Sequence, residues 1–427
     1  MIGTEQRLRL RAPSPALRRA RVDAAAPSTA SVRRRIGWIW GLLFLNVLPY
    51  YFRSPVLHLP VSLGKVITQG ALAVALVLAV SVNRRVLVRS NLFLVLMSLL
   101  CVTSVMMSVH GYFGFGSILR AGRLVMFVAV LWLLTPWWGR SDLFLLRFHR
   151  RALAAVLGIV LLGLAVLPGH ALGQAGGDRL GGVIWPIPPT QVAHYAALFT
   201  GITVVLWFAG MVRPRIAVAA IVTGMAMLLL THTRTAVVAL LVGVLVAALS
   251  LFASRRRVRK AFAVTVVVAA LVALTFAPFL ASWFGRGQSG QELTNLSGRQ
   301  TVWSAVAAQP RSELNTVFGF GMSNDGFDGL SIDSSWYSTY LDQGLFGDVV
   351  DASVLLLLLL IAAFRPRGPG RALALFLVVY CAIASVTETG LGEASPYLLD
   401  LAVAMSLLMS PLTEPDALTP VQPGYDV

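Results

Sequence analysis

The sequence contains few charged residues, and this shortage sets the class of protein. Charged residues make up 12% of the 427 residues, whereas 57% are hydrophobic and the mean hydropathy is +0.77. Soluble globular domains carry about 25% charged residues. Apolar runs of 15 to 22 residues recur along most of the chain, and a helix of about 20 residues spans the hydrocarbon core of a bilayer. The composition therefore excludes a soluble domain and predicts an integral membrane protein.

Cysteine is almost absent. Cys101 and Cys381 are the two cysteines of the chain, and both lie inside apolar runs. Two isolated cysteines exclude a disulfide framework and a zinc pattern, so each is interpreted as a small buried hydrophobe. Asp325, Asp328 and Asp333 lack the dense alternation of a calcium loop. The sequence therefore contains no pattern typical of a metal site.

Lysine is nearly absent as well, so arginine supplies most of the positive charge. The formal net charge is +17, which could indicate a nucleic-acid partner. However, the basic residues stand in short loops between apolar runs and not on a soluble face. We therefore expect membrane lipids, and no nucleic acid, to contact them.

The apolar runs predict an all-α polytopic membrane protein with about 12 transmembrane helices, because runs this continuous are not barrel strands. The predicted spans are 36–52, 62–82, 91–109, 118–135, 152–168, 190–211, 216–231, 235–253, 261–280, 345–364, 371–388 and 397–411. The chain then divides into a disordered basic tail (1–35), nine spans (36–280), a polar loop (281–344), three spans (345–411) and a second tail (412–427). A cleaved signal peptide is not expected, because the basic tail is too long.

Positive charge is distributed unevenly between the two sides of the predicted helices. All but nine of the 35 lysines and arginines lie in the first tail or in alternate loops. The positive-inside rule assigns those segments to the cytoplasm. We therefore expect a multi-pass protein of the cytoplasmic membrane with both termini cytoplasmic and the 281–344 loop external.

The basic residues that break this rule are candidates for function. They are Arg53, Lys65, Arg120, Arg123, Arg179, Arg234, Arg286, Arg299 and Arg311. Snorkelling to lipid headgroups is the simplest interpretation for Arg53 and Arg311. It fits Arg234 poorly, because the turn between the two flanking apolar runs is too short to lift the side chain far from the bilayer. Something anionic is expected to hold these residues.

The external loop contains the features most typical of chemistry. A capping-box spacing and an apolar stripe predict a short amphipathic helix at 298–309 that presents Arg299 in its first turn. Helix amides and a guanidinium together suit a phosphate. Asp333 directly precedes a second helix, rich in aromatic residues, and could act as a general base.

Several segments, taken in order, resemble the O-antigen ligase and Wzy polysaccharide polymerase superfamily. The similar segments are Arg179, Leu180 and Gly182 with 186–191, the Thr-Arg-Thr-Ala turn at 233–236, Gly298 with Arg299, the Phe-Gly-x-Gly turn at 318–321, the Gly-Leu-x-Gly at 344–347, and the TETGLGE segment around Glu388. The resemblance covers roughly residues 60–410.

This resemblance implies a GT-C-like membrane glycosyltransferase of cell-envelope biosynthesis. Such an enzyme transfers a glycan from a polyprenyl-pyrophosphate carrier to an acceptor hydroxyl outside the cytoplasmic membrane, with inversion and without metal, nucleotide sugar or other cofactor. Arg234 and Arg299 are then expected to bind the diphosphate and stabilise charge on the leaving oxygen. Further candidates for substrate binding are Arg179, Arg120, Arg123, Lys65 and His232.

One departure concerns the catalytic base. Ligases usually carry His-Asn-Ser-Tyr before the closing glycines, where this chain has Asp333, Ser334, Ser335 and Trp336. Asp333 could replace the histidine, His232 could act instead, or no base is needed if pyrophosphate leaves readily. This leaves open whether the chain is an exopolysaccharide or O-antigen polymerase or a ligase.

Two other classes of protein compete with this interpretation. A transporter of the major facilitator type would have a long cytoplasmic connection between spans six and seven, but the loop here is MVRPR. A lipid-linked oligosaccharide flippase also needs arginines for pyrophosphate, but they should face a central cavity instead of a long external loop.

Overall fold

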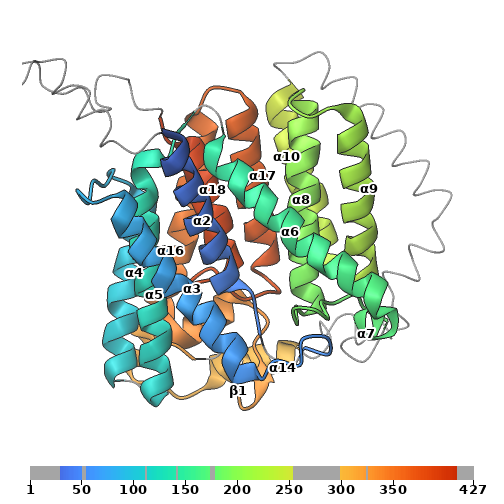
Figure 1. Ribbon diagram of the computed structural model, residues 1–427. Coiled ribbons are helices and arrows are strands. Elements are labelled where there is room, and N and C mark those ends of the chain that lie inside the picture. The colour runs from blue at the N-terminus through green and yellow to red at the C-terminus, as the bar shows by residue number, and fades with distance from the viewer. Residues whose placement is uncertain are drawn as a thin grey trace, which may run out of the picture.

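The computed structural model describes residues 29–50, 54–110, 113–140, 143–173, 178–252, 299–323 and 326–410. Most of these residues are helical, and the helices run side by side in a bundle (Figure 1). The first described helix is α2 (Thr29–Val47), which begins before the predicted span at 36 and includes Arg33, Arg34 and Arg35. Hydrophobic runs mark only the lipid-facing part of a helix and miss such a basic end.

Within the described ranges, seven helices are long and apolar enough to cross a membrane. They are α3 (Val61–Val82), α4 (Leu92–His110), α5 (Gly114–Leu134, continued by the 3-10 turn η1, Thr135–Trp137), α6 (Phe144–Val166), α8 (Pro189–Phe208), α10 (Arg234–Phe252) and α16 (Ser335–Phe364). Shorter apolar helices are α9 (Pro214–Leu230), α17 (Pro369–Ala384) and α18 (Pro396–Leu408). The protein is therefore built as a membrane protein. The expected count of about 12 spans is not confirmed, and the span at 261–280 lies outside the described residues.

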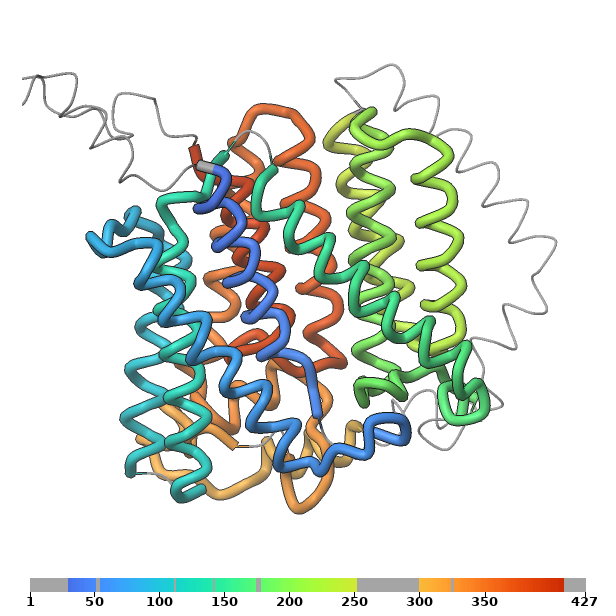
Figure 2. Tube along the Cα trace, viewed as in Figure 1, coloured from blue at the N-terminus to red at the C-terminus, as the bar shows by residue number. Residues whose placement is uncertain are grey.

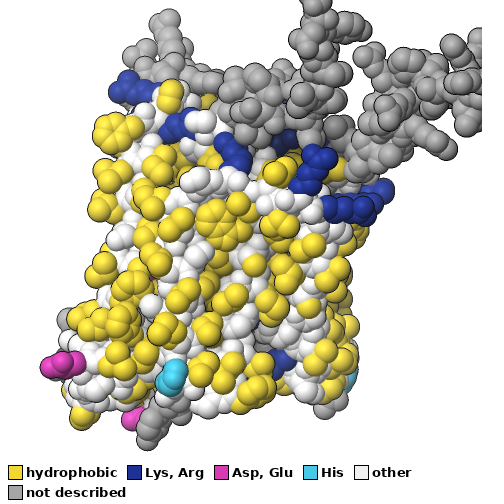
Figure 3. Space-filling view, turned by 90° about the vertical axis from the view of Figure 1, so that its left-hand side faces the viewer, with side chains coloured by type: hydrophobic (Ala, Val, Ile, Leu, Met, Phe, Trp, Pro, Cys, Tyr) yellow, Lys and Arg dark blue, Asp and Glu magenta, His cyan; other side chains and the backbone are white. Residues whose placement is uncertain are grey.

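Apolar side chains fill the interior of the bundle and also occupy the middle of its outer surface. α8 and α18 are buried along almost their whole length, whereas α3 and α4 expose Val74, Val77, Leu99 and Val102. On the face shown in Figure 3, hydrophobic side chains occupy the middle, and most of the visible Lys and Arg gather toward one end. This belt is what a bilayer would cover.

A small layer closes the other end of the bundle. It contains α14 (Arg299–Ala308), α15 (Glu313–Phe318) and the hairpin of β1 (Gly326–Phe327) and β2 (Leu330–Ser331). Val302, Val306, Ile332 and Leu341 form its own core. Figures 1 and 2 show this layer opposite the start of α2 and the end of α18. The amphipathic helix predicted at 298–309 is confirmed from Arg299 onward, although Ala305 of the predicted stripe is exposed.

Two glycines join this layer to α16. The helix breaks at Gly344, where φ is 66° and ψ is −165°, and Gly319 at the end of α15 has φ 77°. A Cβ on Gly344 would lie 2.5 Å from the carbonyl carbon of Val317, and one on Gly319 would lie 2.3 Å from that of Asp342. Only glycine allows both this conformation and this close approach. The layer is thereby fixed against the first half of α16.

Buried polar side chains connect three helices inside the bundle. The Nε2 atoms of His149 in α6 and His194 in α8 each lie 3.0 Å from a different carboxylate oxygen of Asp400 in α18. All three side chains are almost completely buried. α6 runs obliquely across the bundle (Figure 1), and this contact connects it to α8 and α18.

Candidate functional site

The candidate site lies where the end layer meets the bundle. Arg299 is the first residue of α14, and Asp333 stands just before α16 in a left-handed conformation with φ 41°. The Nε atom of Arg299 lies 3.3 Å from Oδ2 of Asp333, and the hydroxyl of Ser331 donates to Oδ1. The side chains are 26% and 41% exposed, so solvent reaches both. This pair is an accessible ion pair and adds little stability by itself.

Arg179 approaches the same place from another segment. Its Nε donates to the carbonyl oxygen of Thr231 at 2.9 Å, and its Nη2 donates to Oγ1 of Thr233 at 3.2 Å. Burial lowers the pKa of Arg179, the charge of Glu388 opposes that shift, and the charge of Arg299 adds to it. The charge of Arg299, from a distant segment, therefore acts on Arg179.

Arg234 belongs to the turn that Arg179 binds. The turn connects α9 to α10, and Arg234 is the first residue of α10. His232 occupies a left-handed conformation in the same turn, with φ 53°. The hydroxyl of Thr387 donates to that of Thr235 at 2.8 Å, so the segment after α17 also reaches this turn. The structure therefore brings Arg234 and His232 to the neighbourhood of Arg179.

Glu388 is the residue that sequence reasoning left without a role. It lies between α17 and α18, where the hydroxyl of Ser335 donates to its backbone carbonyl at 2.8 Å and the amide of Ser335 donates to Ser385 at 2.9 Å. Burial raises the pKa of Glu388 to about 7, the charges of Arg299 and Arg179 oppose this, and that of Asp333 adds to it. Its signals in the sequence are its place at the end of the predicted span 371–388 and the TETGLGE segment that resembles the superfamily.

Three predicted substrate-binding residues are not joined to this cluster. Arg120 donates from Nε and Nη2 to the carbonyl of Met322, at 3.1 and 3.0 Å. Arg123 donates to Oδ1 and the backbone carbonyl of Asn46, at 3.2 and 3.0 Å. Lys65 is exposed on α3. Arg120 therefore connects α5 to the end layer, and Arg123 connects α5 to α2. These contacts account for both basic residues of α5 without a ligand.

The remaining basic residues that break the positive-inside rule are Arg311, Arg53 and Arg286. Arg311 donates to the carbonyls of Tyr340 and Val306, and its guanidinium lies 3.9 Å from the ring centroid of Tyr340. It therefore holds the end layer together. Arg53 and Arg286 lie outside the described residues. In the ranges that the structure covers, no group of three His, Cys, Asp or Glu side chains is placed to hold a metal ion.

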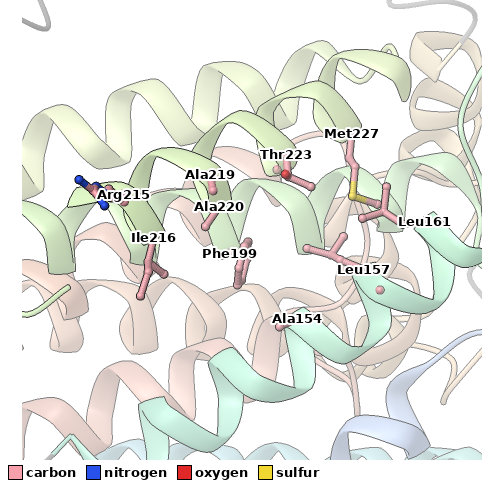
Figure 4. Close-up of a pocket in the computed structure, with 12 residues that line it drawn as sticks. Ala154, Leu157, Leu161, Phe199, Arg215, Ile216, Ala219, Ala220, Thr223 and Met227 are labelled. Carbon is pink, nitrogen blue, oxygen red and sulfur yellow. The ribbon is translucent and has the colours of Figure 1, made fainter. Parts of the chain in front are cut away.

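Two apolar grooves lie on the surface away from the cluster. One, of about 690 Å³, lies between α4 and α15 and is lined by Met106, Met107, Leu314 and Phe318 among others. The other, of about 530 Å³, runs between α6, α8 and α9 and has Arg215 at one end (Figure 4). The first groove is at the same end of the bundle as the cluster, because α15 belongs to the end layer.

The cluster of Arg179, Arg234, Arg299, Asp333 and Glu388 combines fixed positive charge with two carboxylates. The guanidinium groups suit a ligand that carries several anionic oxygens, such as a diphosphate. A carboxylate with a pKa near 7 can take or give a proton near neutral pH. Comparison of the chain with protein-family models and with curated proteins yields no match.

Proposed function

We propose that this protein is a membrane glycosyltransferase that uses a polyprenyl-pyrophosphate-linked glycan. It transfers or polymerises that glycan onto the hydroxyl of a glycan or glycolipid acceptor at the outer face of the cytoplasmic membrane. The observation that carries the proposal is that Arg179 binds the turn before Arg234, through the carbonyl of Thr231 and the hydroxyl of Thr233, neither of which is charged. A diphosphate at this place would supply the negative charge that these guanidinium groups lack.

Three arginines bind the donor in the proposal. Arg299 and Arg234 bind the diphosphate and stabilise the charge that develops on the leaving oxygen, and Arg179 adds a third contact. Asp333 orients Arg299 through the 3.3 Å ion pair. No metal takes part, because the guanidinium groups supply the positive charge.

The order of the similar segments supports the proposal. The turn at 233–236, the segment at 179–182, Arg299 and the segment around Glu388 are far apart in the sequence, but hydrogen bonds and charges connect them in space. These are the segments that resemble the O-antigen ligase and polymerase superfamily. A purely structural membrane protein would have no need to gather them.

We assign the isoprenoid chain of the donor to the groove between α4 and α15. The groove is apolar, and two residues of its lining, Met106 of α4 and Leu314 of α15, are exposed. An isoprenoid chain could therefore enter it from the outer leaflet while the diphosphate lies among the arginines.

Binding of undecaprenyl pyrophosphate to purified protein in detergent tests the proposed site. Arg179→Ala, Arg234→Ala and Arg299→Ala should each weaken binding by roughly 10- to 100-fold, since each removes a charge-assisted hydrogen bond. Arg213→Ala is the matched control, because Arg213 is exposed at the opposite end of the bundle, just before α9. Equal affinity in all four variants and the wild type would contradict the proposal.

A further inference from the structure

Transfer of a glycan to a hydroxyl requires that a proton leave the acceptor oxygen. As the acceptor oxygen bonds to the anomeric carbon, the bond from that carbon to the pyrophosphate oxygen breaks and its electron pair leaves with the pyrophosphate. The acceptor proton must then pass to a base. The histidine expected from the resemblance is absent at position 333, so another group must accept it.

Asp333 is poorly placed for this task. One carboxylate oxygen faces the guanidinium of Arg299, and the other accepts the hydroxyl hydrogen of Ser331. Both carboxylate oxygens are therefore already engaged by groups of the protein. A proton on Asp333 would also disrupt the pairing that orients Arg299.

Glu388 has the opposite surroundings. Its backbone is fixed by Ser335, whose hydroxyl also accepts the amide hydrogen of Leu391 at 3.3 Å. Within the described ranges, no hydrogen bond to the carboxylate of Glu388 is observed, and the residue as a whole is only partly exposed. The charges of Arg299, Arg179 and Asp333 act on this carboxylate. Ser335 therefore fixes the backbone of Glu388, and no hydrogen bond among the described residues occupies its carboxylate oxygens.

We propose that Glu388 is the general base of the transfer reaction. Its ionised carboxylate takes the proton of the acceptor hydroxyl as that oxygen attacks the anomeric carbon, and the pyrophosphate leaves toward Arg299 and Arg234. The carboxylic acid returns its proton to solvent after the product leaves. The inference rests on the proposed function, and it assigns the acceptor subsite to the space beside the segment between α17 and α18.

Single-turnover transfer from an undecaprenyl-pyrophosphate oligosaccharide, measured from pH 5 to pH 9, tests the assignment. The rate of the wild type should rise with pH and level off above about 7, because only the ionised carboxylate accepts a proton and its pKa is raised to about 7. Glu388→Gln should lower the rate by roughly 100-fold or more and remove this inflection. Glu388→Asp should recover part of the rate with a displaced inflection.

Two controls separate this inference from the proposed function. Glu388→Gln should bind undecaprenyl pyrophosphate as the wild type does, whereas Glu313→Gln, at an exposed position of α15, should retain the wild-type rate and pH profile. If Glu388→Gln keeps the rate and the inflection while the arginine variants lose transfer, Glu388 is not the base and the proposed function stands. If Asp333→Asn or His232→Gln removes the inflection instead, that residue is the base. Absence of transfer by the wild type would overturn both proposals.

Discussion

At the scale of single residues, the site is defined by charges that the protein does not neutralise completely. Arg179 makes its hydrogen bonds with a backbone carbonyl and a hydroxyl, and neither carries a formal charge. Arg299 shares its site with Asp333, which solvent also reaches. Burying or gathering guanidinium groups costs free energy unless an anion compensates. The cost is understandable if the ligand is the compensating anion.

The raised pKa of Glu388 predicts a pH-dependent stability. Because the folded protein holds the proton of Glu388 more tightly than the ordinary value of 4.5, protonation favours the folded state. This contribution is complete below about 4.5 and is lost as the pH rises through about 7. Glu388→Gln should therefore have nearly the wild-type melting temperature at pH 5 and a higher one than the wild type at pH 8.

Thermal unfolding in one detergent at both pH values checks this prediction. Glu313→Gln serves as the control, and its difference from the wild type should not follow the same pH dependence. A Glu388→Gln variant that is equally stable relative to the wild type at pH 5 and pH 8 would mean that Glu388 is ionised throughout this range.

Sequence reasoning recognised some site residues because they break a general rule. Arg179, Arg234 and Arg299 stand on the side of the membrane that disfavours basic residues, and this signal needs no tertiary information. The same rule also selected Arg120 and Arg123, whose partners at Met322 and Asn46 are distant in the sequence. Glu388 could not be recognised, because its pKa depends on burial and on charges from three other segments.

At the scale of elements, two glycines decide how the end layer meets α16. Gly344→Ala should destabilise the protein by about 1–3 kcal/mol or more, because its backbone conformation is nearly exclusive to glycine and the new Cβ would contact Val317. Gly41→Ala is the matched control. Gly41 lies within α2 with open space around it, so alanine should be neutral or slightly stabilising.

The melting temperature of the two glycine variants, and the fraction recovered as monodisperse protein, measure this effect. Donor binding should fall together with stability in Gly344→Ala, because the same break in α16 positions the end layer. A Gly344→Ala protein as stable as Gly41→Ala would show that the break in α16 is not needed.

The helices themselves follow from the sequence to a large extent. Long apolar runs predict α3, α4, α8 and α10, because a helix that spans a bilayer is apolar along its whole length. The starts of α2 and α6 were predicted less well, since their first two turns carry arginines that resemble a loop in composition. The contact of His149 and His194 with Asp400 depends on how helices cross and has no sequence signal.

At the scale of the whole molecule, the two ends of the bundle differ in charge. The start of α2 and the end of α18 lie at one end, and the layer with α14 and α15 lies at the other (Figure 1). The positive-inside rule predicts that the first end is cytoplasmic. The candidate site would then face the exterior, where lipid-linked glycans are assembled into polymers in the proposed function.

Cysteine labelling in intact cells tests this orientation. Cys101 and Cys381 are both buried and should not react, so single cysteines can be added to the natural sequence. Asp328→Cys, in the exposed hairpin of the end layer, should react with a membrane-impermeant maleimide. Arg213→Cys and Arg367→Cys should react only after the cells are permeabilised. The reverse pattern would place the site in the cytoplasm and contradict the proposed donor.

The most direct measurement is glycan transfer by the purified protein in liposomes. The reaction contains a polyprenyl-pyrophosphate oligosaccharide and an acceptor glycan, without nucleotide sugar or added metal. We predict that the wild type forms a longer glycan and releases polyprenyl pyrophosphate, and that Arg234→Ala and Arg299→Ala reduce the rate by roughly 100-fold or more while Arg213→Ala does not. Folded wild-type protein that only moves the donor between leaflets, without forming a glycosidic bond, would contradict the account and identify a flippase.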